Sequence, residues 1–296
     1  MKRIVRVLFV ACALLLPGIG VVAAQPIVVG GKAFTEQQIM TAMTVQLLKA
    51  RGFNPERKAG MGSAAVRQAM ENGQIDVYWE YTGTGLQVFN KINDKFGSAE
   101  EAYRKVKEVD AAKGIVWLNM SAVNNAYAFA MNRDDAQKHN IVTMSDLAKA
   151  VKAGKKLTFA SNAEFYARPD GLPGWQQAYG FEFDRENVKR MDTGLVYAAL
   201  KDRQVDTGVV FATDGRIPAF NFVVLKDDRN FGVPYNMTPV VRKEIADKYP
   251  KVVEALNALS AKLNSDNMAR LNASVDVEKK TPEEVADAFL KANGLV

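Results

Sequence analysis

The sequence has little of what many enzymes require. Its one cysteine is Cys12, close to the start of the chain, and its one histidine is His139, which lies in a polar stretch. Zinc sites are built from clustered cysteine and histidine, so neither a metal site nor a cysteine nucleophile is expected. A G-x-S-x-G serine motif and a Walker A loop are also missing. These absences exclude most of the common enzyme classes, and we expect no cofactor.

Long apolar runs of the kind that cross a membrane are missing as well. The apolar run Val7–Leu16 follows a short basic segment and is shorter than the roughly 20 residues that a spanning helix needs. Small residues at 22–24 complete the pattern of a cleaved secretory signal peptide. We therefore expect residues 1–24 to be removed, with cleavage near Ala24, and the mature protein to be exported and soluble.

Removal of this signal peptide changes the charge and the cysteine content. The 39 basic residues become 36 against 33 acidic ones, so the formal net charge falls from +6 to +3. A small excess of this kind gives no indication of nucleic acid as a partner. Loss of Cys12 leaves the mature chain without disulfides or reactive thiols in spite of its export. A lipid anchor on Cys12 is not expected, because Phe9 stands where a leucine is usual.

Strand patterns and helix patterns alternate along the rest of the chain. Short apolar runs typical of strands lie at 27–31, 75–79, 127–131, 156–160, 208–212 and 222–225. Helices are predicted between them at 35–47, 63–72, 98–113, 145–153, 174–179 and 194–203, and in the tail from Thr281. Thr35 with Gln38 suggests a capping box, and Ile39, Met43 and Leu47 follow helical spacing. This order predicts an α/β fold with mainly parallel sheets, and the length predicts two lobes.

Aromatic residues gather at the ends of the predicted strands. They are Trp79, Tyr81, Tyr127, Phe165, Tyr166, Phe211 and Tyr235. Each one alone is more often a core residue than a ligand contact, and we assign Trp79 to packing. Ligands of open α/β sheets bind at strand ends, however, so the shared position makes the set a candidate binding site.

Six segments carry a resemblance to a known family. They are GGKAFTEQ (30–37), NGQIDVYWEYTGTGL (72–86), NNAYAFAM (124–131), EFYARPDGLPGWQQAYGF (164–181), VDTGVVFATDGRI (205–217) and VPYNMTPVVR (233–242). Across essentially the whole mature chain, the sequence resembles the substrate-binding proteins of ABC importers for osmoprotectants. This is the OpuAC-like or ProX/OsmF-like group, which binds glycine betaine and related quaternary ammonium compounds.

The resemblance implies an architecture and partners. The fold would be the two-lobed type II periplasmic-binding-protein fold with the ligand in the cleft between the lobes. Lobe one would contain residues 25–125 and 228–296, and lobe two residues 126–227. The protein would be a monomer that binds a quaternary ammonium solute and delivers it to an ABC permease in the inner membrane, without making or breaking a bond.

The resemblance also implies an aromatic box formed by Tyr81, Tyr127, Phe211 and Tyr235. A trimethylammonium group cannot donate a hydrogen bond and is held by electron-rich ring faces, each contributing about 0.5–2 kcal/mol. Phe211 stands where a tyrosine is expected. It keeps the ring face and lacks the hydroxyl, which leaves the identity of the ligand open.

A carboxylate clamp is implied at Lys32, Thr84 and Arg168, because an arginine can bind a carboxylate through two N–H groups. This set favours betaines over choline. Gln37 and Asn125 are secondary polar candidates. Without the resemblance, Lys32 would be interpreted as a solvated lysine, and Arg168 with Asp170 as a surface ion pair.

Three alternatives remain open at this point. The solute could be choline, carnitine, ectoine or a cationic amino acid. The chain could be an exported enzyme that uses the same cleft, with Asp214 or Glu164 as a base, although we expect Asp214 to organise its loop. It could also be a scaffold or sensor domain that docks to a partner protein.

Overall fold

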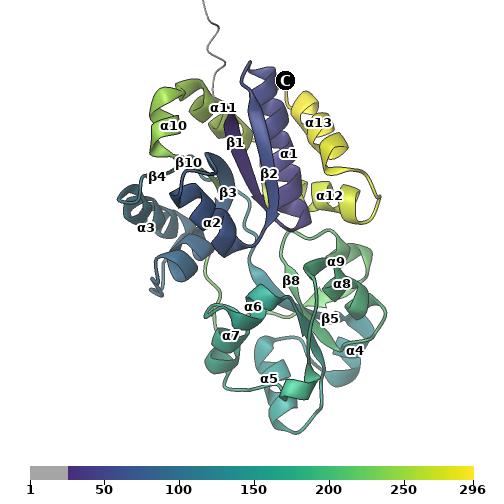
Figure 1. The fold of residues 1–296 in the computed structure, drawn as a ribbon. Coiled ribbons are helices and arrows are strands. Elements are labelled where there is room, and N and C mark those ends of the chain that lie inside the picture. Colours follow the sequence, from purple (N-terminus) through teal and green to yellow (C-terminus); the bar gives the residue numbers. More distant parts are fainter. Residues whose placement is uncertain (1–25) are drawn as a thin grey trace, which may run out of the picture.

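The computed structural model describes residues 26–296, which form two lobes, each built around a five-stranded sheet (Figure 1). The predicted signal peptide and Cys12 lie outside the described residues.

The first sheet has the order β2-β1-β3-β10-β4. Its strands are β1 (Ile27–Lys32), β2 (Pro55–Met61), β3 (Val77–Tyr81), β4 (Ile115–Trp117) and β10 (Met237–Arg242). The second has the order β7-β6-β8-β5-β9. Its strands are β5 (Tyr127–Asn132), β6 (Phe159–Ser161), β7 (Val188–Arg190), β8 (Thr207–Phe211) and β9 (Phe222–Val224).

Both sheets are mixed. The prediction of parallel pairing is confirmed for β1 with β2 and β3, and for β6 with β7 and β8. The prediction of mainly parallel sheets is wrong, because β10 runs antiparallel to both β3 and β4, and β5 runs antiparallel to both β8 and β9. The reason is that each of these strands begins at the edge where its partner ends: Met237 pairs with Tyr81, and Tyr127 pairs with Phe211. Both strands therefore start beside the opposite lobe.

Strands β4, β7 and β10 have no counterpart in the predicted elements, and neither does strand β2. It lies at the edge of the first sheet, and most of its side chains are exposed. An edge strand of this kind carries no apolar run, because only one side of it is paired and its faces contact water. The polar segment around Pro55–Lys58 therefore gave no strand signal.

Helices cover both faces of the first sheet. They are α1 (Thr35–Ala50), α2 (Ser63–Glu71), α3 (Ala99–Ala111), α10 (Lys243–Lys248), α11 (Pro250–Ser260), α12 (Ser265–Asp276) and α13 (Pro282–Ala292), with a π-helical turn η1 (Thr84–Phe89). Ile39, Met43 and Leu47 of α1 are fully buried, as their spacing predicts. The tail returns to lobe one, where α12 and α13 pack against α1. The helix start at Thr281 forms the predicted capping box.

One predicted capping box is wrong. Phe34, not Thr35, precedes the first residue of α1, and no side chain caps that end. The Thr35 hydroxyl instead donates a hydrogen bond to Asp276 Oδ1 at 2.8 Å. The hydroxyl of Thr35 thus binds a residue 241 positions away instead of the backbone of its own helix, and a local sequence pattern contains no information about such a partner.

The second sheet carries shorter helices. They are α4 (Arg133–His139), α5 (Met144–Lys152), α6 (Ala163–Ala167), α7 (Leu172–Tyr179), α8 (Thr193–Lys201) and α9 (Arg216–Ala219), with a 3-10 turn η2 (Arg185–Asn187). A core of aromatic side chains, among them Phe129, Phe159 and Trp175, lies on one face of this sheet. None of the helices in residues 26–296 has both the length and the apolar character needed to span a bilayer.

The chain crosses between the lobes twice, and the two crossings lie side by side. Asn124 pairs with Asn236 in an antiparallel bridge, and the Asn125 N–H donates to the Tyr235 carbonyl at 3.0 Å. Asn125 and Tyr235 are therefore held on the backbone that connects the lobes. Asn125 and Tyr235 therefore lie between the two lobes.

Candidate functional site

A cleft of about 1240 Å³ lies between the lobes. Lys32 and Tyr81 line it from the ends of β1 and β3, while Tyr127 and Phe211 line it from the paired start of β5 and end of β8. The same strand ends that carry the aromatic residues in the sequence thus meet at one place. This cleft lies at the position expected from the α/β pattern.

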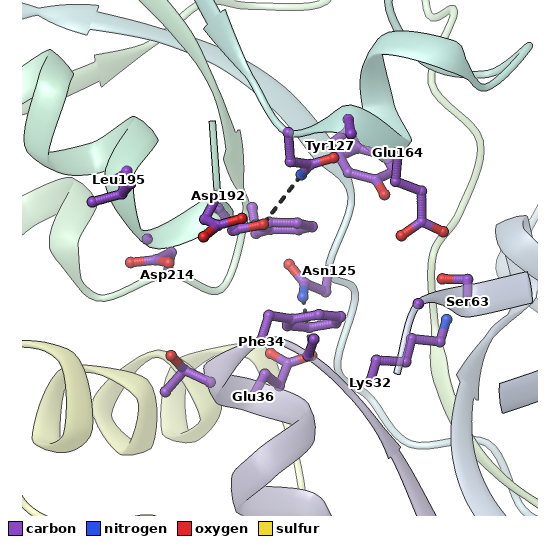
Figure 2. A pocket seen from close by; sticks show the side chains of 18 of the residues that line it. Lys32, Phe34, Glu36, Ser63, Asn125, Tyr127, Glu164, Asp192, Leu195 and Asp214 are labelled. Atoms are coloured by element: carbon purple, nitrogen blue, oxygen red, sulfur yellow. Dashed lines mark hydrogen bonds between the residues drawn. The ribbon is translucent and has the colours of Figure 1, made fainter. Parts of the chain in front are cut away.

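Five aromatic rings gather in this cleft. Tyr127 lies 5.2 Å from Phe211 and 5.5 Å from Tyr235 between ring centroids, and the second pair is edge-to-face. Phe34 stacks on Phe211 at 5.3 Å with an interplanar angle of 8°, and on Tyr81 at 6.2 Å. Phe34 comes from lobe one and Phe211 from lobe two, so the rings bridge the two lobes. Figure 2 shows Phe34 beside Asn125 and above Glu36.

Phe34 was not among the predicted site residues. It stands two residues after β1, at the same kind of strand end as the other aromatic residues, and that signal was available in the sequence. Trp79, in contrast, is buried in the core of lobe one, where its indole N–H donates to Thr44 at 2.9 Å.

The structure brings the predicted site residues together, with one exception. Tyr81, Tyr127, Phe211, Tyr235, Lys32, Thr84, Arg168 and Asn125 all line the cleft. Gln37 lies behind it, buried, and its amide N–H donates to the Tyr81 hydroxyl at 3.0 Å. In this position Gln37 orients the Tyr81 ring. Gln37 is therefore not placed as the ligand contact predicted from the sequence.

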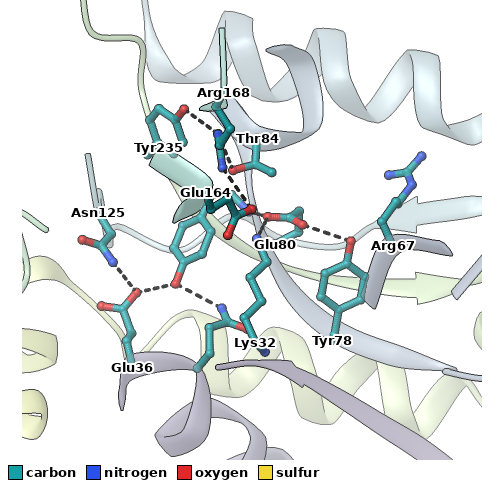
Figure 3. A network of polar contacts seen from close by, with 12 residues as sticks. Lys32, Glu36, Arg67, Tyr78, Glu80, Thr84, Asn125, Glu164, Arg168 and Tyr235 are labelled. Carbon is teal, nitrogen blue, oxygen red and sulfur yellow. Dashed lines mark hydrogen bonds and ion pairs between the residues drawn. The ribbon is translucent and has the colours of Figure 1, made fainter. Parts of the chain in front are cut away.

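Lys32 is a buried residue with a carboxylate partner. It is 3% exposed, and its ammonium lies 2.5 Å from Glu80 Oε1. Glu80 is fully buried and also accepts a hydrogen bond from the Tyr78 hydroxyl at 3.1 Å (Figure 3). The interpretation of Lys32 as a solvated lysine is therefore wrong, and the positive charge that it brings to the cleft is already paired.

Arg168 is likewise buried, and so is its partner Asp170. Its Nε donates to Asp170 Oδ1 at 2.8 Å and its Nη2 to Asp170 Oδ2 at 2.5 Å. The same Nη2 lies 3.0 Å from the Tyr235 hydroxyl and 3.4 Å from the Thr84 hydroxyl (Figure 3). The surface ion pair considered from sequence is therefore a buried link between lobe two and lobe one.

The turn between α6 and α7 holds Arg168 in place. A Cβ on Gly171 would lie 2.0 Å from the Phe165 carbonyl oxygen, and one on Gly174 would lie 2.2 Å from the Pro169 carbonyl oxygen. Only glycine fits so close to backbone atoms. The segment ARPDGLPG therefore folds back tightly enough to aim Arg168 at the cleft.

Glu36 is the most deeply buried carboxylate of the cleft wall. It accepts hydrogen bonds from the Tyr81 hydroxyl at 2.6 Å, Asn125 Nδ2 at 3.0 Å, the Thr213 hydroxyl at 2.5 Å and Asn272 Nδ2 at 3.3 Å. Burial raises the pKa of its carboxyl above the usual value, and these hydrogen bonds offset only part of that rise. The sequence analysis did not single out Glu36, because an acid in the first turn of a helix ordinarily stabilises that helix end.

The two carboxylates considered as enzymatic bases both face arginines. Asp214 accepts hydrogen bonds from Arg216 Nε at 2.9 Å and Nη2 at 2.6 Å, which holds its loop as expected. Glu164 is about 3.7 Å from Arg168. Arg216 also lies 3.3 Å from Asp276 of lobe one, so it adds a further contact between the lobes.

Comparison with known proteins gives consistent results. Residues 25–292 match the family model for the substrate binding domain of the ABC-type glycine betaine transport system. A glycine-betaine-binding protein of Pseudomonas aeruginosa is 43% identical over 302 residues, which cover 100% of this chain and 96% of that protein. The glycine betaine-binding protein YehZ of Escherichia coli is 31% identical over 280 residues, or 92% of each chain.

A solved structure described as a glycine betaine/carnitine/choline ABC transporter superimposes with a TM-score of 0.72. It is 29% identical, and the match covers 91% of this chain and 99% of that one. The two-lobed fold is therefore the one predicted from the sequence.

Proposed function

This chain belongs to the family of substrate-binding domains of ABC-type glycine betaine transport systems, and from that premise we propose that its own ligand is glycine betaine or a related quaternary ammonium osmolyte. The observation that carries this proposal is the meeting of Tyr81, Tyr127, Phe211 and Tyr235, from both lobes, in one cleft.

The ring faces supply the recognition of the ammonium head. A trimethylammonium group cannot donate a hydrogen bond, and each ring face within about 6 Å adds about 0.5–2 kcal/mol. Phe211 keeps the face that this interaction needs, and Phe34 adds another ring to it. A head group that carries N–H donors would lose its hydrogen bonds with water against these faces, so methylated ammonium groups are favoured.

The carboxylate of a betaine would be held by Thr84, Lys32 and the free edge of Arg168. Asp170 already accepts from Nε and Nη2 of Arg168. Nη1 has only long contacts, 3.4 Å to the Tyr127 hydroxyl and 3.7 Å to Glu164, so it is the group that we assign to a ligand. We therefore propose a single hydrogen bond from Arg168 to the ligand in place of the two-pronged contact expected from sequence. Since Lys32 is also paired with an acid, the rings supply more of the affinity than the clamp.

Transport follows from the arrangement of the lobes. The cleft is lined from both sides, so a bound solute contacts both lobes and favours their closed arrangement. We propose that the protein works as a monomer in the periplasm, after removal of the signal peptide, and that an ABC permease recognises the closed form. The solute leaves unchanged.

Calorimetric titration of the refolded, ligand-free mature protein tests this proposal. Refolding is needed because a copurified solute would mask binding. Glycine betaine should bind saturably, whereas ectoine and arginine, which lack a trimethylammonium group, should bind at least tenfold more weakly. Choline and carnitine complete the series. Silence for glycine betaine beside a clear signal for another solute would contradict the assigned ligand, and conversion of any bound solute would favour the enzyme alternative.

A further inference from the structure

Among the charged side chains that line the cleft and are buried, all but Glu36 have an ion-pair partner. Lys32 lies against Glu80, Arg168 against Asp170, and Arg216 against Asp214. None of the ion pairs within residues 26–296 includes Glu36, although its side chain is buried and lines the cleft. Its negative charge therefore has no counter-charge from the protein in that part of the chain.

The hydrogen bonds to Glu36 fit the ionised form. Oε1 accepts from Tyr81 and Asn125, and Oε2 accepts from Thr213 and Asn272, so each oxygen has two donors. A protonated carboxyl would donate one of these bonds instead, to the Tyr81 or Thr213 hydroxyl, because an amide N–H₂ cannot accept; only the carboxylate accepts all four. The orientation of Asn125 is fixed by its own carbonyl, which accepts from the Thr213 N–H at 3.4 Å.

All four donors are neutral, so they stabilise the carboxylate without cancelling its charge. Burying a charged group that has no opposite charge nearby costs free energy, and an opposite charge that comes close reduces this cost. The ring cluster offers the position for such a charge, because Tyr81 donates to Glu36 through its hydroxyl and also lines the cleft. A head group against that ring would lie about one phenol ring away from the carboxylate.

We propose that Glu36 is the counter-charge for the head group of the ligand, and that it makes the cleft select solutes with a permanently cationic head group over solutes with an uncharged head group of the same shape. The inference rests on the proposed function, since it needs a quaternary ammonium group in the ring cluster. At that separation, a carboxylate shifts the binding constant of a cation on the order of tenfold or more.

The test compares glycine betaine with 3,3-dimethylbutanoate, in which a carbon atom replaces the ammonium nitrogen. Both are titrated into the wild-type protein and into Glu36→Gln. The variant should bind glycine betaine at least about tenfold more weakly, while its affinity for 3,3-dimethylbutanoate stays within about threefold or rises. The ratio of the two affinities isolates the charge, because a merely structural role would lower both.

The glutamine variant is expected to fold. Its amide oxygen can accept from Tyr81 and Asn125, and its N–H₂ can donate to the Thr213 hydroxyl, which rotates to accept. Glu254→Gln, on the exposed side of α11, is the matched control and should leave both affinities unchanged. If Glu36→Gln does not fold, Asn272→Lys tests the same charge, because a lysine there would pair with the carboxylate that Asn272 now faces.

The outcomes separate the two proposals. If the wild-type protein binds glycine betaine and Glu36→Gln keeps the full preference for it over 3,3-dimethylbutanoate, the role of Glu36 is wrong and the proposed function stands. An equal loss for both ligands would also overturn it. If the wild-type protein binds no quaternary ammonium solute, the proposed function fails, and this inference fails with it.

Discussion

Replacing Arg168 by alanine is expected to lower the free energy of unfolding by about 3–5 kcal/mol, because it leaves the buried Asp170 without its charge partner. It also removes the guanidinium that links Tyr235 and Thr84 to lobe two. Chemical denaturation of the ligand-free protein measures the change. Removing Asp170 as well, in Arg168→Ala/Asp170→Ala, should restore part of the stability, since no unpaired charge then remains.

Arg203→Ala is the matched control for this variant. Arg203 also pairs with two aspartates, Asp134 and Asp135, but its side chain is half exposed, so its loss should cost under about 1 kcal/mol. An equal loss of stability in Arg168→Ala and Arg203→Ala would contradict the burial argument.

Binding to the folded Arg168→Ala protein gives a second result. Glycine betaine should lose more affinity than choline, because choline has no carboxylate for Arg168 to bind. Equal losses would show that Arg168 contributes through lobe closure alone.

Replacing Tyr235 by alanine is expected to weaken the binding of glycine betaine by about 1–3 kcal/mol, through loss of one ring face from the cluster. Tyr235 lies edge-to-face with Tyr127, and its ring is held against Gly83, where a Cβ would come within 2.6 Å of it. Its position is therefore well defined, and its removal opens one wall of the cleft. Calorimetric titration measures the change.

Tyr235→Phe separates the ring from its hydroxyl. The hydroxyl contacts Arg168 and Asp170, whereas the ring faces the cleft. The phenylalanine variant should keep most of the affinity, as Phe211 does by the same reasoning. A loss as large as that of Tyr235→Ala would assign the contribution of Tyr235 to its hydrogen bonds and remove its ring from the box.

The sequence predicted most elements because their signals are local. Helical spacing in 39–47, the capping box at Thr281 and the apolar runs of the buried strands all depend on neighbours within a few residues. Four strands were missed. The edge strand β2 is paired on one side and exposed on its faces, β4 and β7 have only three residues each, and β10 contains Pro239, a residue that is disfavoured inside strands. The capping box at Thr35 failed because Asp276, far along the chain, competes for its hydroxyl.

The candidate site was predicted in the same uneven way. Family resemblance and strand-end position indicated the aromatic residues, and the fold brings them to one cleft. The acid partners could not be predicted, because Glu80 meets Lys32 only through the pairing of strands 48 residues apart. Nothing in the sequence around Glu36 indicated a site residue, since the groups that donate hydrogen bonds to it come from both lobes and from the segment that connects them.

The crystal structure of the refolded protein with glycine betaine tests the central claim most directly. The ammonium nitrogen should lie within about 6 Å of the ring centroids of at least three of Tyr81, Tyr127, Phe211 and Tyr235, with the carboxylate toward Thr84 and Arg168. A solute bound away from these rings, or with its ammonium group facing solvent, would contradict the account.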